Sequence, residues 1–318
     1  MELPIKLQLA IENQTTLLKH EKLVKDAQSI SEKYRTGSGQ GKRLVTTNNE
    51  AIVYSVVRMP ATYGAVYSAL KCTLSLISCD IKTMSDVGAG TGAATWACDA
   101  LLDLNSIVCL EREPVMQNLG QMMMCDSSEA LSKSKWLQYD ITKDDIKDKT
   151  DLVVASYMLN ELSDTERIKA IDKLWNATNG FLLIVEPGTP VGFSHLKKAR
   201  EHLLSKDGHV VAPCTHEGVC KISDDDWCHF TCRIQRSKLH KKLKGGEVPY
   251  EDEKFTYLAV AREKHHNAQA RVLRHPIIEK GRISLVLCTE ENIKKTTICK
   301  KDGELYKKVR KVQCGDEV

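Results

Sequence analysis

The sequence predicts an α/β fold built on a doubly wound parallel sheet. From Lys82 onward, apolar segments of strand length alternate with segments of helical periodicity. Strands separated by helices pair in parallel, and the helices cover both faces of the sheet. A glycine-rich turn directly after the first strand supports the same assignment. The predicted strands are Thr83–Val87, Ser106–Leu110, Trp136–Tyr139, Leu152–Ala155 and Phe181–Val185, and the predicted helices are Ala93–Leu102, Pro114–Cys125 and Thr165–Ala177.

The segments on either side of this alternation have a different character. Residues 5–34 carry apolar side chains at helical spacing, Thr36–Lys42 (TGSGQGK) predicts a flexible linker, and further helices are expected over Glu50–Arg58 and up to Leu76. Beyond the cysteine-rich stretch, short strands are predicted at Phe255–Val260, Ile283–Cys288 and Thr296–Cys299. We therefore expect an N-terminal helical segment (1–80), an α/β domain (81–207), a cysteine-rich segment with a basic run (208–250) and a small β-rich module (251–318).

Composition and cysteine content limit the class of protein. The 318 residues are 42% hydrophobic and 28% charged, which is typical of a globular protein. The longest apolar runs are too short to span a bilayer, and the first residues show no secretory or transit pattern. We expect a cytoplasmic monomer without membrane association. In a reducing compartment, a local cluster among the 12 cysteines indicates a metal site rather than disulfides.

Charge is distributed unevenly along the chain. Arg233–Val318 holds 21 Lys and Arg against 12 Asp and Glu, a balance of +9, whereas residues 1–232 hold 25 against 30, a balance of −5. A basic end on an acidic body indicates an anionic partner, most simply a nucleic acid. The alternative is a solvated, lysine-rich face with no partner.

The glycine-rich turn, SDVGAGTGAAT, predicts a nucleotide-type cofactor site. Gly88, Gly90 and Gly92 allow the backbone to bend and approach a ligand, and the free N–H groups at the start of the next helix suit a polar or anionic group. Glu111 ends the second strand, where a carboxylate accepts hydrogen bonds from ribose hydroxyls.

Two cofactors are compatible with this turn. Gly88-x-Gly90-x-x-Ala93 satisfies the relaxed dinucleotide fingerprint, so an NAD-linked enzyme is one alternative. Asp86 directly precedes the turn, and an acidic residue before GxGxG resembles class I methyltransferases, which bind S-adenosylmethionine (SAM). That resemblance implies that Asp140 contacts adenine and that Asn160 lies near the methyl acceptor. A methyltransferase fold kept as a scaffold is a further alternative.

The sequence identifies no catalytic residue. No sequence like Asn-Pro-Pro-Tyr, the mark of exocyclic amine methylation, follows the fourth strand. Pro213-Cys214 resembles the nucleophilic cysteine of RNA cytosine-5 methyltransferases, but it follows the fifth strand rather than the fourth. Direct methyl transfer depends mainly on alignment of the two reactants. The sequence pattern therefore indicates neither that the protein is an active enzyme nor that it is inactive.

Residues 208–233 contain four cysteines at a spacing of C-x5-C-x7-C-x3-C. Four thiolates suit zinc or an iron–sulfur cluster, and only the last pair approaches the tight knuckle that structural zinc prefers. His216 and His229 are possible further ligands, but we favour ordinary polar loop positions for both. The alternative for the whole cluster is a set of buried structural thiols, and Asp224–Asp226 are expected to face solvent. The cysteines are Cys214, Cys220, Cys228 and Cys232.

The same stretch carries a family resemblance. APCTHEGVC, then DWCHF, a basic run and PYEDEKFTYLAVAR resemble the methyltransferase-like assembly proteins of the small ribosomal subunit, which occur in mitochondria and have bacterial homologues. RMPATYG, DVGAGTG, SYMLNEL and EPGTPVGF follow the family's order, so the resemblance covers residues 50–318. It implies binding to small-subunit rRNA during assembly, a SAM-type fold and a 4Fe–4S cluster, with zinc as the alternative metal.

The resemblance also implies which residues hold the cluster. The ligands would be Cys214, Cys220 and Cys228 together with Cys288 from SLVLCT, whereas the position of Cys232 is commonly not cysteine in relatives. Alternatives to an assembly factor are an active SAM-dependent rRNA methyltransferase and an NAD-linked iron–sulfur oxidoreductase. We further expect six cations of the basic run to contact phosphates, namely Arg233, Arg236, Lys238, Lys241, Lys242 and Lys244.

Overall fold

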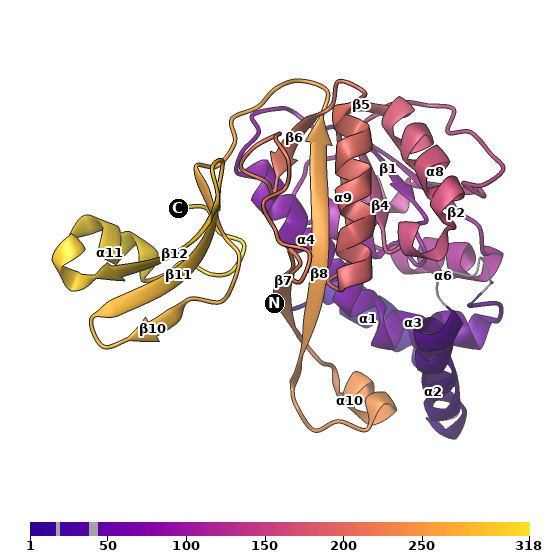
Figure 1. Ribbon diagram of the computed structural model, residues 1–318. Coiled ribbons are helices and arrows are strands. Elements are labelled where there is room, and N and C mark those ends of the chain that lie inside the picture. The colour runs from indigo at the N-terminus through magenta and orange to yellow at the C-terminus, as the bar shows by residue number, and fades with distance from the viewer. Residues whose placement is uncertain (17–19, 38–43) are drawn as a thin grey trace.

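The computed structural model describes residues 1–16, 20–37 and 44–318, and its centre is an eight-stranded sheet with helices on both faces (Figure 1). The strands are β1 (Thr83–Val87), β2 (Ser106–Glu111), β3 (Lys135–Gln138), β4 (Thr150–Ser156), β5 (Thr178–Pro187), β6 (His209–Ala212), β7 (Phe230–Gln235) and β8 (Tyr250–Ala261). Their order is β3-β2-β1-β4-β5-β8-β6, with β7 also paired to β8. Strands β1 to β5 are parallel, which confirms the predicted α/β sheet, and β8 runs antiparallel to its three neighbours.

In the described ranges of the N-terminal segment, four helices precede the sheet: α1 (Ile5–Thr15), α2 (His20–Gly37), α3 (Asn48–Val57) and α4 (Met59–Leu74). A reciprocal capping box between Thr47 and Glu50 starts α3. The MPATYG sequence forms the first turns of α4, where Pro60 is tolerated because the N–H that proline lacks has no helical partner at this position. Helix α2 extends to Gly37, and the rest of the predicted linker lies outside the described residues.

The remaining helices cover the two faces of the sheet. α5 (Ala93–Asp99), α6 (Pro114–Met124) and α7 (Glu129–Ser132) lie with α4 on one face, and α8 (Asp164–Asn176) and α9 (Pro190–Leu204) lie on the other. Successive residues of β4 alternate between the two cores. Leu152 and Val154 pack with the first group, and Val153 and Ala155 pack with the second, all fully buried.

Two strands share one edge of β8. β6 pairs with the last residues of β8, and β7 pairs with its first half. The chain between them, residues 213–229, leaves the sheet and returns to the same edge, so the cysteine-rich stretch is an excursion between two short strands. β8 was expected in the C-terminal module, but its register with β5 places it inside the main sheet. The division into four domains otherwise stays a prediction.

The C-terminal residues form a second, four-stranded sheet that stands to one side of the main one (Figure 1). It comprises β9 (Ala270–Val272), β10 (Ile277–Glu279), β11 (Arg282–Thr289) and β12 (Ile293–Cys299), followed by the turn η2 (Lys300–Asp302) and α11 (Glu304–Val309). A small core of its own includes Val272, Leu285 and Val309. Helix α10 (Lys238–Lys244) connects β7 to β8. In the described ranges, no helix combines the length and apolar character needed to cross a bilayer.

Candidate cofactor pocket and cysteine cavity

A cavity of about 780 Å³ lies at the carboxyl ends of the parallel strands. Gly88 and Gly90 follow β1, Glu111 ends β2, and Asp140 follows β3, and all four line this cofactor pocket. Residues directly after β4 complete the wall. Open α/β sheets bind their ligands at this edge, where the order of the strands reverses. Four of the seven predicted cofactor residues therefore surround one pocket.

The turn after β1 needs its glycines. Gly88, Gly90 and Gly92 have φ values of 72°, 58° and 86°, in the left-handed region that favours glycine. A Cβ on Gly88 would lie 3.0 Å from the side chain of Met158, so a larger residue there would press on the opposite wall of the pocket. Gly92 does not line the pocket, because it caps the start of α5.

Asp86 lies beneath the turn and is fully buried. Its Oδ2 accepts hydrogen bonds from the backbone N–H and the hydroxyl of Thr95, at 3.1 and 2.7 Å, which fixes α5 to β1. Burial raises the pKa of Asp86 to about 7. Its side chain is not part of the pocket wall, so its predicted contribution to cofactor binding, which stays a prediction, would act through the turn.

Glu111 connects two loops of the pocket. Its Oε2 accepts a hydrogen bond from the Gly90 N–H at 2.7 Å, and its Oε1 accepts one from the Glu113 N–H at 2.8 Å. Burial raises the pKa of Glu111. One carboxylate thereby orders both the turn after β1 and the turn after β2, and it also lines the cofactor pocket.

Further acidic side chains make the pocket electronegative. Glu113 and Glu161 also line it. Burial raises the pKa of Glu161 to about 7, with the carboxylates of Glu111 and Glu113 acting in the same direction and Arg112 in the opposite one. A positive charge placed between clustered carboxylates reduces the electrostatic repulsion among them. The pocket therefore suits a ligand that carries cationic groups.

Asp140 and Asn160 differ in their relation to the pocket. Asp140 Oδ1 accepts hydrogen bonds from the Thr142 N–H and hydroxyl, at 3.0 and 2.7 Å, and its side chain faces the cavity. Asn160 lies in the short turn η1 (Leu159–Glu161) after β4 and does not line the cavity. The turn is anchored below by Glu186, whose Oε1 accepts a hydrogen bond from the Leu159 N–H at 3.0 Å.

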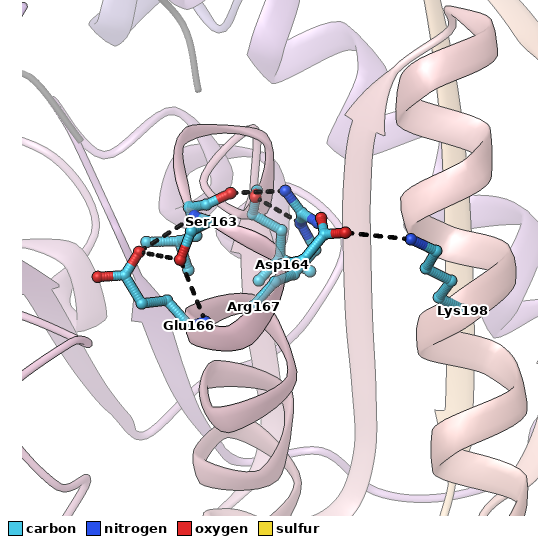
Figure 2. Close-up of polar contacts among 7 residues, drawn as sticks. Ser163, Asp164, Glu166, Arg167 and Lys198 are labelled. Atoms are coloured by element: carbon cyan, nitrogen blue, oxygen red, sulfur yellow. Dashed lines mark hydrogen bonds and ion pairs between the residues drawn. The ribbon is translucent and has the colours of Figure 1, made fainter. Parts of the chain in front are cut away.

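Arg167 of α8 holds η1 from the other side (Figure 2). Its buried guanidinium donates to the carbonyl oxygens of Leu159 and Leu162, at 3.0 and 2.5 Å, and pairs with Asp164. Asp164 reaches Lys198 of α9 at 3.3 Å, so the contact extends to the next helix. Sequence reasoning missed this support for the pocket.

A sequence signal for this support does exist. Ser163 and Glu166 form a capping box at the start of α8, visible in Figure 2, and the S-x-x-E spacing predicts such a box. Arg167 directly follows Glu166, the last residue of the box, and its side chain points back toward η1.

The N-terminal helical segment also contributes to the pocket, through Leu44, Val45 and Tyr54. No sequence pattern predicted this contribution.

A second cavity, of about 50 Å³, is lined by four cysteines. Cys214, Cys220 and Cys228 come from the excursion between β6 and β7, and Cys288 comes from β11 of the C-terminal sheet. We call this the cysteine cavity. Burial raises the pKa of Cys214 and Cys228, and raises that of Cys288 to about 11. The structure thus brings together the four thiols that the family resemblance implied.

The other candidate ligands lie differently. Cys232 is buried in β7 and packs near Gly64 of α4, away from the cavity lining. His216 borders the cavity, and His229 packs against Trp227 with the ring centroids 5.1 Å apart. Among the residues that the structure describes, no three His, Cys, Asp or Glu side chains form a group that would hold a single metal ion. Ligation by the four cysteines stays a prediction.

The chemistry around the cysteine cavity fits an anionic occupant. Arg200 and Arg271 are 5% and 1% exposed, and both lie against the cysteine segment. A buried guanidinium is costly unless an anion compensates its charge. Four metal-bound thiolates supply such a charge, because they outweigh the positive charge of an iron–sulfur core or a zinc ion.

The basic run is partly engaged inside the molecule, and the expectation that all six of its cations contact phosphates stays a prediction. Arg233 forms two hydrogen bonds to Asp252, at 2.7 and 2.8 Å. Glu251 is surrounded by three basic side chains, at 3.5, 3.0 and 2.7 Å, from Arg236, His240 and Lys244. The exposed cations left in α10 include Lys238 and Lys242.

The strand order, with one antiparallel strand inserted next to β5, and the glycine-rich turn at the end of β1 define a Rossmann-like fold of the SAM-methyltransferase class. Residues 48–318 match the family Rsm22, described as mitochondrial small ribosomal subunit Rsm22. The chain belongs to this family.

Two curated relatives are similar over part of their length. The chain is 28% identical over 216 residues to the human mitochondrial ribosome assembly protein METTL17, which covers 60% of this chain and 45% of the relative. It is 29% identical over 195 residues to the Schizosaccharomyces pombe mitochondrial Rsm22-cox11 tandem protein 2, covering 55% and 26%. The chain therefore spans less than half the length of these relatives.

Two solved structures overlay on the chain in part. Magnesium protoporphyrin IX methyltransferase from Synechocystis, with bound SAM, has a TM-score of 0.43 at 11% identity and covers 78% of this chain and 99% of its own. A putative RNA methyltransferase from Pyrococcus horikoshii has a TM-score of 0.42 at 15% identity, covering 64% and 86%. The assignment of the fold depends on the strand order above and not on these overlays.

Proposed function

We propose that the protein is an rRNA-binding assembly factor of the small ribosomal subunit that binds SAM in the cofactor pocket and a 4Fe–4S cluster in the cysteine cavity. One observation carries this proposal: the stretch that matches the family of a small-subunit protein, residues 48–318, contains the glycine turn, Glu111 and Asp140 of the cofactor pocket and all four cysteines of the cysteine cavity. The name of the human relative, a ribosome assembly protein, supports the same assignment. The curated relatives are mitochondrial, which favours that compartment over the cytoplasm.

In this proposal, the acidic pocket binds SAM through complementary charge. The sulfonium and amino groups of SAM are cationic, and Glu111, Glu113 and Glu161 face the cavity. Glu111 would accept hydrogen bonds from the ribose hydroxyls, and Asp140 would lie beside the adenine. The turn at Gly88 and Gly90 lets the ligand approach the backbone closely.

The cluster would be held by Cys214, Cys220, Cys228 and Cys288. When bound, it would supply cross-links between the excursion after β6 and strand β11, and so between the two sheets of the molecule. Metal binding of this kind contributes directly to folding stability, because the ligands are far apart in the unfolded chain. The C-terminal sheet would then be fixed in place by the cluster.

The C-terminal sheet would present the main phosphate-binding surface. Its last strand, turn and helix carry many exposed cations, whereas half of the earlier basic run is already paired. Each phosphate contact by Lys or Arg releases counterions and makes binding sensitive to salt. The exposed cations are Lys294, Lys295, Lys300, Lys301, Lys307, Lys308, Arg310 and Lys311.

The RNA part is tested by measuring affinity for small-subunit rRNA at a series of salt concentrations. A triple variant, Lys294→Gln, Lys295→Gln and Lys301→Gln, should weaken binding and reduce the slope of log K against log salt by roughly 2 to 3. A matched triple variant on the acidic body, Lys147→Gln, Lys149→Gln and Lys169→Gln, should leave both unchanged. Equal effects of the two triples would contradict this surface.

The cofactor part is tested by purification without oxygen, followed by visible spectroscopy and by iron, sulfide and zinc analysis. Iron and sulfide bound to the wild-type chain and lost in Cys288→Ser, but retained in Cys232→Ser, support the proposed cluster. Stoichiometric zinc without iron would replace the cluster with a zinc site. Calorimetry with SAM and with NADH separates the SAM proposal from the NAD-linked alternative, and transfer of labelled methyl groups to rRNA would identify an active methyltransferase.

A further inference from the structure

Two buried arginines approach the cysteine cavity from different elements. Arg200 extends from α9 and lines the cavity. Arg271 lies in β9, where it stands opposite Cys288 in the register with β11. Their exposed fractions are 5% and 1%. Both charges are therefore withdrawn from water beside the four thiols.

Each guanidinium holds the backbone that carries the cysteines. Arg200 Nη2 donates to the carbonyl oxygens of His216 and Gly218, at 2.7 and 2.8 Å, inside the loop between Cys214 and Cys220. Arg271 Nε donates to the carbonyl oxygen of Pro213 at 3.1 Å, directly before Cys214.

Arg271 also reaches two distant segments. Its Nη1 donates to the carbonyl oxygen of Gly315, at 2.9 Å, and lies 2.9 Å from the sulfur of Cys72 in α4. One side chain thus links the cysteine loop, the N-terminal helices and the C-terminal tail. Replacing Arg271 would remove contacts to all three segments at once.

The hydrogen bonds of both arginines go to neutral acceptors. In the described part of the chain, neither guanidinium forms an ion pair with a carboxylate, and Arg200 Nε and Arg271 Nη2 have no hydrogen-bond partner. Buried polar groups are normally satisfied, and buried charges are normally compensated. Glu317, opposite Arg271 in an isolated β-bridge, is the one carboxylate shown to act on either guanidinium in the described ranges. Two buried cations with so little compensation beside four thiols indicate that the contents of the cavity are anionic.

We propose that Arg200 and Arg271 are positioning residues that compensate the negative charge of the thiolate-ligated group in the cysteine cavity and fix the loop that carries its ligands. This inference rests on the proposed metal-binding function of the cavity. Removal of a residue that contacts the metal ligands commonly weakens metal affinity 10- to 100-fold. The two arginines are the residues that would have this effect here.

The test compares Arg200→Met and Arg271→Met with Arg200→Lys and Arg271→Lys in the full chain, purified without oxygen. The measurements are the midpoint potential of the cluster and the rate at which a chelator removes iron. Each Met variant should lower the potential, because a positive charge near the cluster is lost, and should release iron roughly tenfold faster or more. The Lys variants should keep a potential close to that of the wild type but release iron faster, because the forked hydrogen bonds are lost.

Arg262→Met is the matched control. Arg262 also donates to a carbonyl oxygen, that of Thr178 at 3.0 Å, and stacks on Trp175, but its contacts are with β5 and α8 and not with the segments that carry the four cysteines. It should leave both measurements unchanged. Unaltered potential and iron release in all four variants at the two arginines would overturn the inference, and so would equal effects of the control. If the Met variants fail to fold, the Lys variants decide the question through iron release.

Failure of the proposed cofactor gives a different result. A wild-type chain that binds zinc but no iron would refute the cluster, and the same four variants would then be compared by their zinc affinity. A roughly tenfold weaker affinity in the variants would support the inference, and an unchanged affinity would refute it. A wild-type chain that binds neither metal refutes both proposals.

Discussion

The backbone N–H of Gly90 donates a 2.7 Å hydrogen bond to the carboxylate of Glu111. Through this contact, the end of β2 determines the shape of the turn at the end of β1. The second oxygen of Glu111 accepts from the N–H of Glu113, so the carboxylate also shapes the turn that follows its own strand. The acidic residue expected to bind ribose is therefore also a structural element of the pocket.

We expect Glu111→Gln to weaken SAM binding by about tenfold. The amide can accept only one of the two backbone hydrogen bonds, and hydrogen bonds to a charged group are worth about 1.5–3 kcal/mol. Calorimetry with SAM or its demethylated product measures the effect. Glu129→Gln is the control, because Glu129 is an exposed partner of Lys133 on α7. An unchanged dissociation constant for Glu111→Gln would show that the carboxylate is not needed in its charged form.

Gly192 of the EPGTPVGF sequence is expected to tolerate no side chain. A Cβ at this position would lie 2.2 Å from the carbonyl oxygen of Pro187, a backbone atom that cannot move aside. We expect Gly192→Ala to lower the free energy of unfolding by about 3 kcal/mol, as measured with urea. The comparison is Gly245→Ala. Gly245 has a φ of 61° but open space around it, so this substitution should lower the free energy of unfolding by only about 1 kcal/mol. Equal losses would indicate that the contact with Pro187 relaxes freely.

Removal of the Arg167 guanidinium should loosen η1. Arg167→Met leaves the carbonyl oxygens of Leu159 and Leu162 without this donor, and we expect a loss of about 2–4 kcal/mol in stability. Hydrogen exchange of residues 159–162 should accelerate at the same time. Lys198→Met removes the exposed partner of Asp164 and should cost less than about 1 kcal/mol. Slow exchange in the Arg167 variant would mean that Glu186 alone holds the turn.

Glu186 should make the protein less stable as pH rises. Burial raises its pKa from 4.5 to about 8, so the native state retains a proton that the unfolded chain releases. Its contribution to the free energy of unfolding therefore falls between about pH 4.5 and pH 8. Glu186→Gln cannot titrate, so its stability relative to the wild type should increase across this window, by on the order of a few kcal/mol.

Urea unfolding at several pH values between 5 and 8 measures this difference. Glu247→Gln, in an exposed position, should follow the wild-type profile throughout. Parallel profiles for the wild type and Glu186→Gln would show that Glu186 keeps an ordinary pKa in the folded protein.

The sequence predicted the parallel strands well, because each is a short apolar run between helical segments and its neighbours follow in order. The sequence wrongly assigned β8 to the C-terminal module. The run Phe255–Val260 has strand character, but its residues do not indicate which strand it pairs with. Pairing with β5 joins residues 68 to 80 positions apart, from Pro187↔Phe255 to Phe181↔Ala261, and only the folded chain determines such a contact.

The sites show the same difference between local and distant information. The glycine turn and Glu111 follow fixed spacings along one βαβ unit, so the sequence was sufficient to find them. Arg200 and Arg271 act through carbonyl oxygens at least 16 positions away in the chain, and an arginine in a helix or strand gives no signal of that kind. The capping box before Arg167, by contrast, is a local signal. The expected grouping of Cys288 with the other three cysteines came from family resemblance and not from spacing.

The order in which the chain is synthesised gives the cysteine cavity one more property. Cys214, Cys220 and Cys228 leave the ribosome first, and Cys288 follows 60 residues after Cys228. Domains generally fold from the N-terminus during synthesis, so β8 and β9 must be made before the fourth thiol can join the others. A nascent chain that stops short of β11 has three of the four thiols and none of the wall that β11 provides. A cavity with all four thiols therefore forms only in a chain that has been synthesised through β11 and whose C-terminal sheet has packed against the cysteine segment.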